Sequence, residues 1–70
     1  MEPQEQFAAN LRRLRQEAGL SQEELGFAAA IHRTEVGLLE RGDRDPQLKT
    51  LVKLARGLGV SLDALLAGIA

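Results

Sequence analysis

The apolar residues of this chain recur at helical spacing along almost its whole length. Spacing of the i, i+4, i+7, i+11 type places apolar side chains on one face of a first amphipathic helix, predicted over about residues 4–18. No run of alternating valine, isoleucine or aromatic residues indicates a strand. The pattern therefore predicts an all-α chain. The expected inward positions of the first helix are Phe7, Leu11, Leu14 and Ala18.

Glycine, serine and proline residues mark where the further helices begin and end. Gly19 is expected to end the first helix, because glycine tolerates the left-handed conformation that follows a helix end. Ser21 and Glu24 have the S-x-x-E spacing of a capping box, which starts a second helix. We expect Asp45 to cap the fourth helix and Pro46 to lie in its first turn. The four further helices are predicted over about residues 22–29, 33–41, 47–57 and 62–68 or slightly beyond.

The inward positions of the predicted helices define a small candidate core. A chain of 70 residues buries only about 60% of its unfolded surface. We therefore expect one domain over residues 1–70. After the first helix, the candidate core positions are Leu25, Ala29, Val36, Leu39, Leu48, Leu51, Leu54, Ala55, Leu58, Leu62, Leu65, Leu66 and Ile69.

The most informative stretch is residues 20–42, which contains the second and third predicted helices. A short turn at residues 30–32 separates them, and the second of the two carries polar side chains outward. Two short helices joined in this way are typical of a helix-turn-helix, in which the second helix enters the DNA major groove. The sequence thus predicts a DNA-recognition helix over about residues 33–41.

The exposed face of that third helix carries the candidate base-reading side chains. Arg33 presents a planar fork of donors that matches the two acceptors on a guanine edge, and Thr34 offers a hydroxyl and a methyl group. Glu35 can accept from a cytosine amino group or repel phosphate, and Leu38 can touch thymine methyl groups. The alternative is an ordinary solvated helix face, with Leu38 as an incidental exposed leucine. The two-helix pattern favours base contact for Arg33 and Thr34.

The charge balance of the chain is mildly acidic, with a net charge of -1 and a pI of about 5.7. This counts against nucleic-acid binding, because such domains are usually basic. The distribution of charge matters more than its sum. We expect the acidic pair Glu23 and Glu24 to lie away from a modestly positive face that gives low non-specific affinity. That face carries the cations Arg33, Arg41, Arg44 and Lys49, with Gln22 and the second helix's first amides as a phosphate grip.

Several other classes of protein are disfavoured by what the sequence lacks. It has no cysteine and a single histidine, so neither a zinc–thiolate nor a multi-histidine metal site is expected. It has no apolar run of transmembrane length and no signal-peptide pattern at its start. No nucleophile–base pair, no carboxylate pair with a plausible pocket and no phosphate loop indicates an enzyme. We expect a cytoplasmic, cofactor-free, non-enzymatic protein.

Three segments resemble the Cro/C1-type (XRE) helix-turn-helix family of phage and bacterial repressors. The segments read LRRLRQEAGLSQEEL, HRTEVGLLERG and LKTLVKLARGLGVSLDALL, and the resemblance covers about residues 11–66. HRTEV, LERG and Phe27 also resemble the small controller proteins of restriction–modification systems. The resemblance implies a compact five-helix domain of the lambda-repressor type, acting as a sequence-specific transcriptional regulator.

The resemblance also implies roles for individual residues. Arg15 and Glu40 would form a partly buried ion pair between the first and third helices. The family usually works as a homodimer on an inverted repeat, often through its last helix. The apolar excess of the last helix agrees with this, since Leu62 and Leu66, with Leu58 or Ile69, can pack across a two-fold axis. The implied DNA contacts are Gln22, Arg41, Arg44 and Lys49 to the backbone, and Arg33, Thr34 and Leu38, with Glu35 beside them, to bases.

Four positions depart from the family's usual pattern. Ala30 replaces a common glycine in the turn, where alanine is strained, so we expect a slightly altered turn. Gly26 replaces a common alanine and is expected to permit a closer approach of two helices. His32 replaces serine or threonine, which predicts a poorer N-cap on the third helix. Glu35 beside the groove is electrostatically unfavourable.

A second class of function also fits the sequence. An antitoxin or another protein-interaction module would use the same fold to hold a protein partner. The acidic pI and Phe27, expected on the outer side of the second helix, support it. A lone exposed apolar residue also needs no explanation, so both readings of Phe27 stay open.

Overall fold

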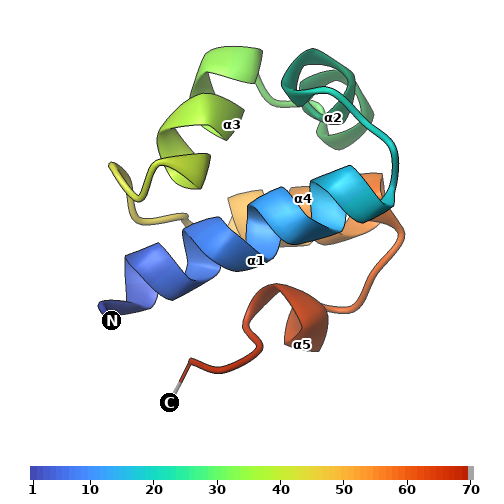
Figure 1. Cartoon of the computed structure of the whole chain (residues 1–70). Helices are drawn as coiled ribbons and strands as arrows, with labels where there is room; N and C mark the ends of the chain where they lie inside the picture. The colour runs from blue at the N-terminus through green and yellow to red at the C-terminus, as the bar shows by residue number, and fades with distance from the viewer. Residues whose placement is uncertain (70) are drawn as a thin grey trace.

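A computed structural model describes residues 1–69 and contains no strand among them. Figure 1 shows α1 running across the molecule, with α2 and α3 on one side of it and α5 on the other. The predicted all-α class is confirmed. The helices of the described residues are α1 (Pro3–Glu17), α2 (Gln22–Ala29), α3 (Arg33–Glu40), α4 (Leu48–Leu58) and α5 (Leu62–Leu65).

The helix boundaries follow mainly from local capping. Ser21 and Glu24 form the predicted capping box: the Ser21 hydroxyl accepts from the Glu24 amide at 3.0 Å, and the Glu24 carboxylate accepts from the Ser21 amide at 2.8 Å. The pKa of the Glu24 carboxyl is lowered, chiefly by the hydrogen bond from the Ser21 amide and then by the Ser21 side chain, because both favour the charged carboxylate. Gly59 ends α4 in the left-handed conformation, with φ of 70°.

The start of α4 differs from its prediction. The N-cap residue is Gln47, so Asp45 does not cap the helix and Pro46 lies before it rather than in its first turn. Pro46 instead lines an open pocket together with Phe7 of α1. Leu48 was expected inward but is 73% exposed, because it begins the helix one turn before the packed positions.

The last helix is shorter than predicted and ends at Leu65. Asn10, which is fully buried in α1, donates from its Nδ2 to the carbonyls of Leu65 and Ala67, at 2.8 Å each. Gly68 then takes a φ of 78°. The carbonyl groups that would continue the helix therefore bond to a side chain of α1 instead. Ala70 lies outside the described residues.

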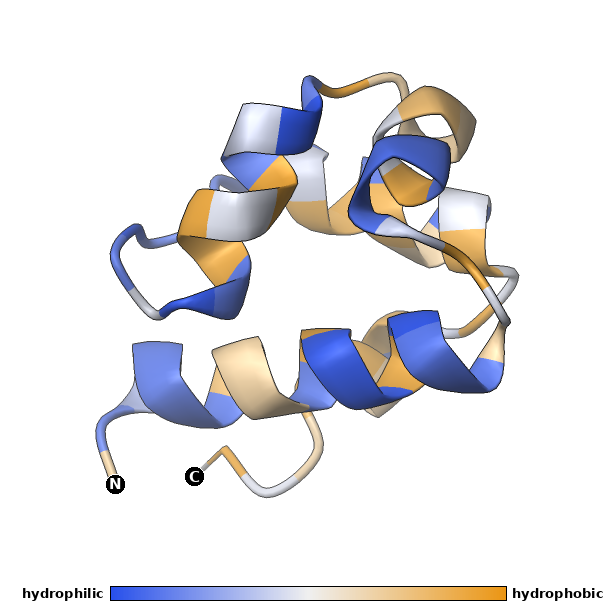
Figure 2. Cartoon of the chain, turned by 45° about the horizontal axis from the view of Figure 1, so that its top comes forward, coloured by the Kyte–Doolittle hydropathy of each residue, from blue (hydrophilic) through white to orange (hydrophobic). Residues whose placement is uncertain are grey.

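The core lies where the helices meet, and Figure 2 shows hydrophobic and hydrophilic bands alternating along them. α2 packs against α3 and α4, α1 packs against α3, and α5 packs against α1 and α4. Of the expected inward residues, Ala18 is exposed as the C-cap of α1, while Leu62 and Leu66 are only partly covered. The largest fully buried apolar side chains are Phe7, Leu11, Leu25, Val36, Leu39, Leu54 and Leu65.

Candidate nucleic-acid interface

The turn between α2 and α3 keeps a left-handed conformation despite its alanine. Ala30 has φ of 59° and ψ of 43° and is the one non-glycine residue with positive φ among residues 1–69. The Ile31 amide donates to the Gly26 carbonyl at 2.9 Å, which closes the turn. An L-residue in this conformation is strained by about 1–2 kcal/mol. The expected departure at Ala30 therefore appears as local strain, while the left-handed turn itself is kept.

Two glycines allow α2 to lie close to its neighbours. A Cβ on Gly26 would meet the Ile31 carbonyl oxygen at 2.8 Å, so the close approach expected there is confirmed. A Cβ on Gly57 of α4 would meet the Ala29 backbone nitrogen at 2.9 Å. The sequence analysis does not predict this second contact, because it treats position 57 only as the last residue of the fourth predicted helix. Together the two contacts fix α2 against α3 on one side and α4 on the other.

The N-terminus of α3 is capped by His32. The ring Nδ1 accepts a hydrogen bond from the Thr34 amide at 3.0 Å, and the His32 backbone is extended, as an N-cap requires. The imidazole thus supplies the acceptor that a serine or threonine hydroxyl would supply. The third helix therefore has a side-chain N-cap, which holds the first turn of the predicted recognition helix. The lower strength expected of this cap stays a prediction.

The structure leaves the N-terminal edge of α3 open. Arg33 and Thr34 are exposed there, and Glu35 and Leu38 are partly covered. The predicted phosphate contacts Gln22, Arg41, Arg44 and Lys49 are also exposed. None of these polar side chains is packed inside the molecule, so the face is accessible to a large ligand.

Three arginines near this open edge are paired with carboxylates. The Arg33 guanidinium lies 2.9 Å from the Glu23 carboxylate, although Glu23 was expected to lie away from the face. The angle between α2 and α3 brings the two side chains together. The other pairs are Arg44 with Glu35 at 2.5 Å and Arg41 with Asp43 at 3.2 Å. Lys49 takes part in no ion pair within residues 1–69.

A further arginine–glutamate pair, unlike those at the edge, is buried behind the face. The Arg15 guanidinium donates twice to the Glu40 carboxylate, at 2.6 and 3.0 Å, and once to the Leu20 carbonyl at 2.8 Å. Glu40 is 3% exposed. The hydrogen bonds to Glu40 raise the pKa of the Arg15 guanidinium, because they favour its charged form. Arg12, which the sequence analysis did not single out, donates to the Glu40 backbone carbonyl.

Gln22 connects the open edge to that buried pair. Its Nε2 donates to the Glu40 carboxylate at 3.1 Å. A Cβ on Gly37 would lie 3.7 Å from the Gln22 Oε1 and 3.3 Å from an Arg41 terminal nitrogen. The absence of a side chain at Gly37 therefore leaves room for both. The hydrogen bond to Glu40 therefore orients the exposed Gln22 side chain at the start of α2.

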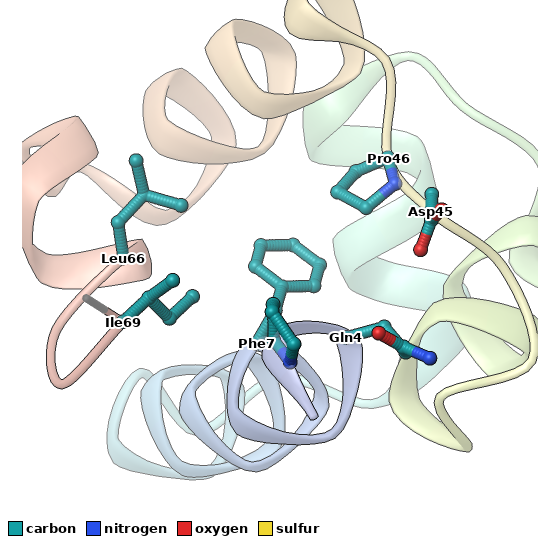
Figure 3. A pocket seen from close by; sticks show the side chains of 7 residues that line it. Gln4, Phe7, Asp45, Pro46, Leu66 and Ile69 are labelled. Atoms are coloured by element: carbon teal, nitrogen blue, oxygen red, sulfur yellow. The ribbon is translucent and has the colours of Figure 1, made fainter. Parts of the chain in front are cut away.

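The C-terminal part of the chain leaves apolar surface uncovered. Leu62 is 37% exposed and Leu66 is 39% exposed, while Leu58 and Ile69 are partly covered. Leu66 and Ile69 border an open pocket of about 330 Å³. Figure 3 shows the Phe7 ring between these two side chains and Pro46. Phe27, on α2, is a separate apolar residue and is 90% exposed.

These features together define a helix-turn-helix domain: a left-handed turn, a capped second helix and an open polar edge on that helix. A sequence model of the helix-turn-helix family matches residues 11–65, and the chain belongs to this family, which is of the Cro/C1 (XRE) type. The family consists of transcriptional regulators and not of enzymes. The chain is therefore a DNA-binding transcriptional regulator.

The relatives of the chain include two control proteins. The chain is 41% identical to control protein C.SmaI of Serratia marcescens over 66 residues, which are 94% of this chain and 79% of that protein. It is 36% identical to control protein C.BamHI of Bacillus amyloliquefaciens over 55 residues, which are 77% of this chain and 68% of that protein.

A solved structure extends this similarity to the fold. The crystal structure of the restriction–modification controller protein C.AhdI from Aeromonas hydrophila has a TM-score of 0.86 at 40% identity, covering 89% of this chain and 94% of that one.

Within residues 1–69, none of the helices combines the length and the apolar character that crossing a membrane requires.

Proposed function

We propose that this chain binds an inverted-repeat DNA operator as a homodimer and regulates transcription from it. The observation that carries the proposal is the open N-terminal edge of α3, where Arg33 and Thr34 are exposed. Recognition helices enter the major groove by this end, so both side chains are placed to reach base edges. The hydrogen bond from the Thr34 amide to His32 supports the rigidity of that end of the helix.

The proposed contacts divide into two kinds. Arg33 reads a guanine edge, Thr34 reads a neighbouring base or phosphate, and Leu38 packs against thymine methyl groups, with Glu35 at the side of the groove. The backbone contacts position the domain without reading sequence. Their candidates are Gln22 at the start of α2, Arg41 and Arg44 after α3, and Lys49 in α4.

A homodimer supplies the second recognition helix. The partly exposed Leu62 and Leu66 and the adjoining Ile69 support a two-fold apolar contact, because a small domain gains from covering such surface. Two α3 helices would then enter successive major grooves about 34 Å apart. The similarity to controller proteins further supports a role in regulating restriction–modification genes.

Selection of bound sites from a random duplex pool tests this function. We expect the wild-type chain to enrich a palindromic sequence with half-sites one helical turn apart. The matched selection uses Arg33→Ala, which should lose the preference at one base pair of each half-site. Enrichment of no sequence by the wild-type chain would contradict sequence-specific binding. Enrichment of a single unrepeated half-site would contradict the homodimer.

A further inference from the structure

The candidate base-reading arginine is held by a residue of another helix. The Glu23 carboxylate of α2 lies 2.9 Å from a terminal nitrogen of Arg33 at the start of α3. The two side chains are 73% and 64% exposed, respectively. Neither the sequence pattern nor the proposed contacts give Glu23 a role, and an acidic residue beside a DNA-binding face needs an explanation.

The pair contributes little to holding the two helices together. Exposed arginine–carboxylate pairs stabilise folded proteins only weakly. The α2–α3 arrangement is already fixed by the close approach at Gly26 and by the buried Leu25 and Val36. The main consequence of the contact therefore falls on the Arg33 side chain itself, which it restricts.

The geometry leaves Arg33 able to bind a base. Glu23 accepts from the Nη1 nitrogen alone. A guanidinium has five N–H donors, and a guanine edge needs two of them, so a guanine contact is compatible with the pair. A DNA phosphate placed at Arg33 would instead lie beside the Glu23 carboxylate and be repelled. The contact thus disfavours backbone binding by Arg33 more than base binding.

We propose that Glu23 is a positioning residue that restricts Arg33 to base-edge contact and thereby sets sequence specificity. This inference rests on the proposed DNA-binding function. The other paired cations differ from Arg33, since Arg41 and Arg44 are candidates for phosphate contact rather than base reading. Among the carboxylates that pair with these three arginines, Glu23 is the one whose partner reads bases, so its removal should change the discrimination between sequences through Arg33.

Binding of two duplexes by Glu23→Gln tests the proposal. One duplex carries the site enriched by the wild-type chain, and the other has the same composition in scrambled order. We expect the affinity for the scrambled duplex to rise more than that for the selected site, so that their ratio falls roughly two- to fivefold. The matched control is Glu17→Gln, which removes the same charge from the exposed Arg13–Glu17 pair of α1 and should leave the ratio unchanged.

A double-mutant cycle separates positioning from a direct effect of charge. In the Arg33→Ala background, Glu23→Gln should leave the affinity ratio of the two duplexes unchanged. A ratio that Glu23→Gln does not alter in the wild-type background overturns the proposal. If Glu23→Gln still lowers the affinity ratio in the Arg33→Ala background, the proposal is also overturned, because Glu23 would then act on DNA independently of Arg33. If the wild-type chain enriches no site, the proposed function itself fails, and this inference fails with it.

Discussion

Two arginine–glutamate pairs of this molecule share their chemistry and differ in their surroundings. Arg15 and Glu40 are buried behind the recognition helix, and the carboxylate there accepts from Arg15 and from Gln22. Arg33 and Glu23 lie at the open edge, where one hydrogen bond joins them. A buried charge that loses its partner is costly, whereas an exposed one is solvated by water. The first pair is thus suited to holding the domain together. The second is suited to orienting an exposed side chain while adding little to stability.

Removing Glu40 should have the largest effect on stability. Glu40→Ala leaves the Arg15 guanidinium without its carboxylate in a mostly buried site, so the free energy of unfolding should fall by about 3 kcal/mol. Urea unfolding followed by circular dichroism measures this loss. The matched variant Glu23→Ala breaks the exposed pair and should cost less than about 1 kcal/mol. Equal losses in the two variants would show that burial does not distinguish the pairs.

Removing Arg33 should weaken DNA binding and leave the stability of the fold almost unchanged, which is the opposite of the effect expected for Glu40. Arg33→Ala loses a bidentate base contact, so binding to the selected site should weaken by about 1–3 kcal/mol while unfolding hardly changes. Gel-shift titrations on the selected and scrambled duplexes measure the loss. The control Arg13→Ala removes an exposed, paired arginine from α1. It should weaken binding to either duplex much less than Arg33→Ala weakens binding to the selected one. An equal loss on both duplexes for Arg33→Ala would assign Arg33 to the backbone instead.

The sequence sufficed for features that depend on local spacing. The apolar periodicity located α1 to α4 to within one or two residues, and the Ser21–Glu24 spacing identified the capping box. The strain at Ala30 and the close approach at Gly26 were anticipated from the family resemblance, because both positions depart from its usual residues, although the turn itself is not altered.

The sequence was insufficient where side chains far apart in the chain meet. The end of α5 depends on Asn10, which is 55 residues before its partner Leu65. Pro46, expected in the first turn of α4, instead lies before the helix and lines a pocket with Phe7 of α1. Glu23 and Arg33 are ten residues apart in two helices, so only the angle between those helices brings them together. No periodicity within one helix encodes such contacts.

Replacing His32 should have a smaller effect, confined to the first turn of α3. His32→Ala removes the acceptor of the Thr34 amide, and loss of an N-cap costs about 1 kcal/mol. His32→Ser restores an acceptor and should recover most of that loss in urea unfolding. The difference between the Ala and Ser variants measures how much the open edge of α3 depends on its own capping bond rather than on the buried Arg15–Glu40 pair. Equal stability of the Ala and Ser variants would mean that the imidazole contributes nothing as a cap.

The smallest expected effect concerns the pH dependence of the α2 cap. The Ser21 amide lowers the pKa of the Glu24 carboxyl in the folded chain. A carboxyl with a lowered folded pKa binds fewer protons than in the unfolded chain, so it stabilises the fold above its unfolded pKa of about 4.3. That contribution is lost as the pH falls through the lower folded pKa. Glu24→Gln keeps a capping acceptor that does not titrate, so the melting temperature of wild type should fall relative to this variant below about pH 4. A difference between the two proteins that stays constant from neutral to acid pH would show that ionisation of Glu24 does not strengthen the cap.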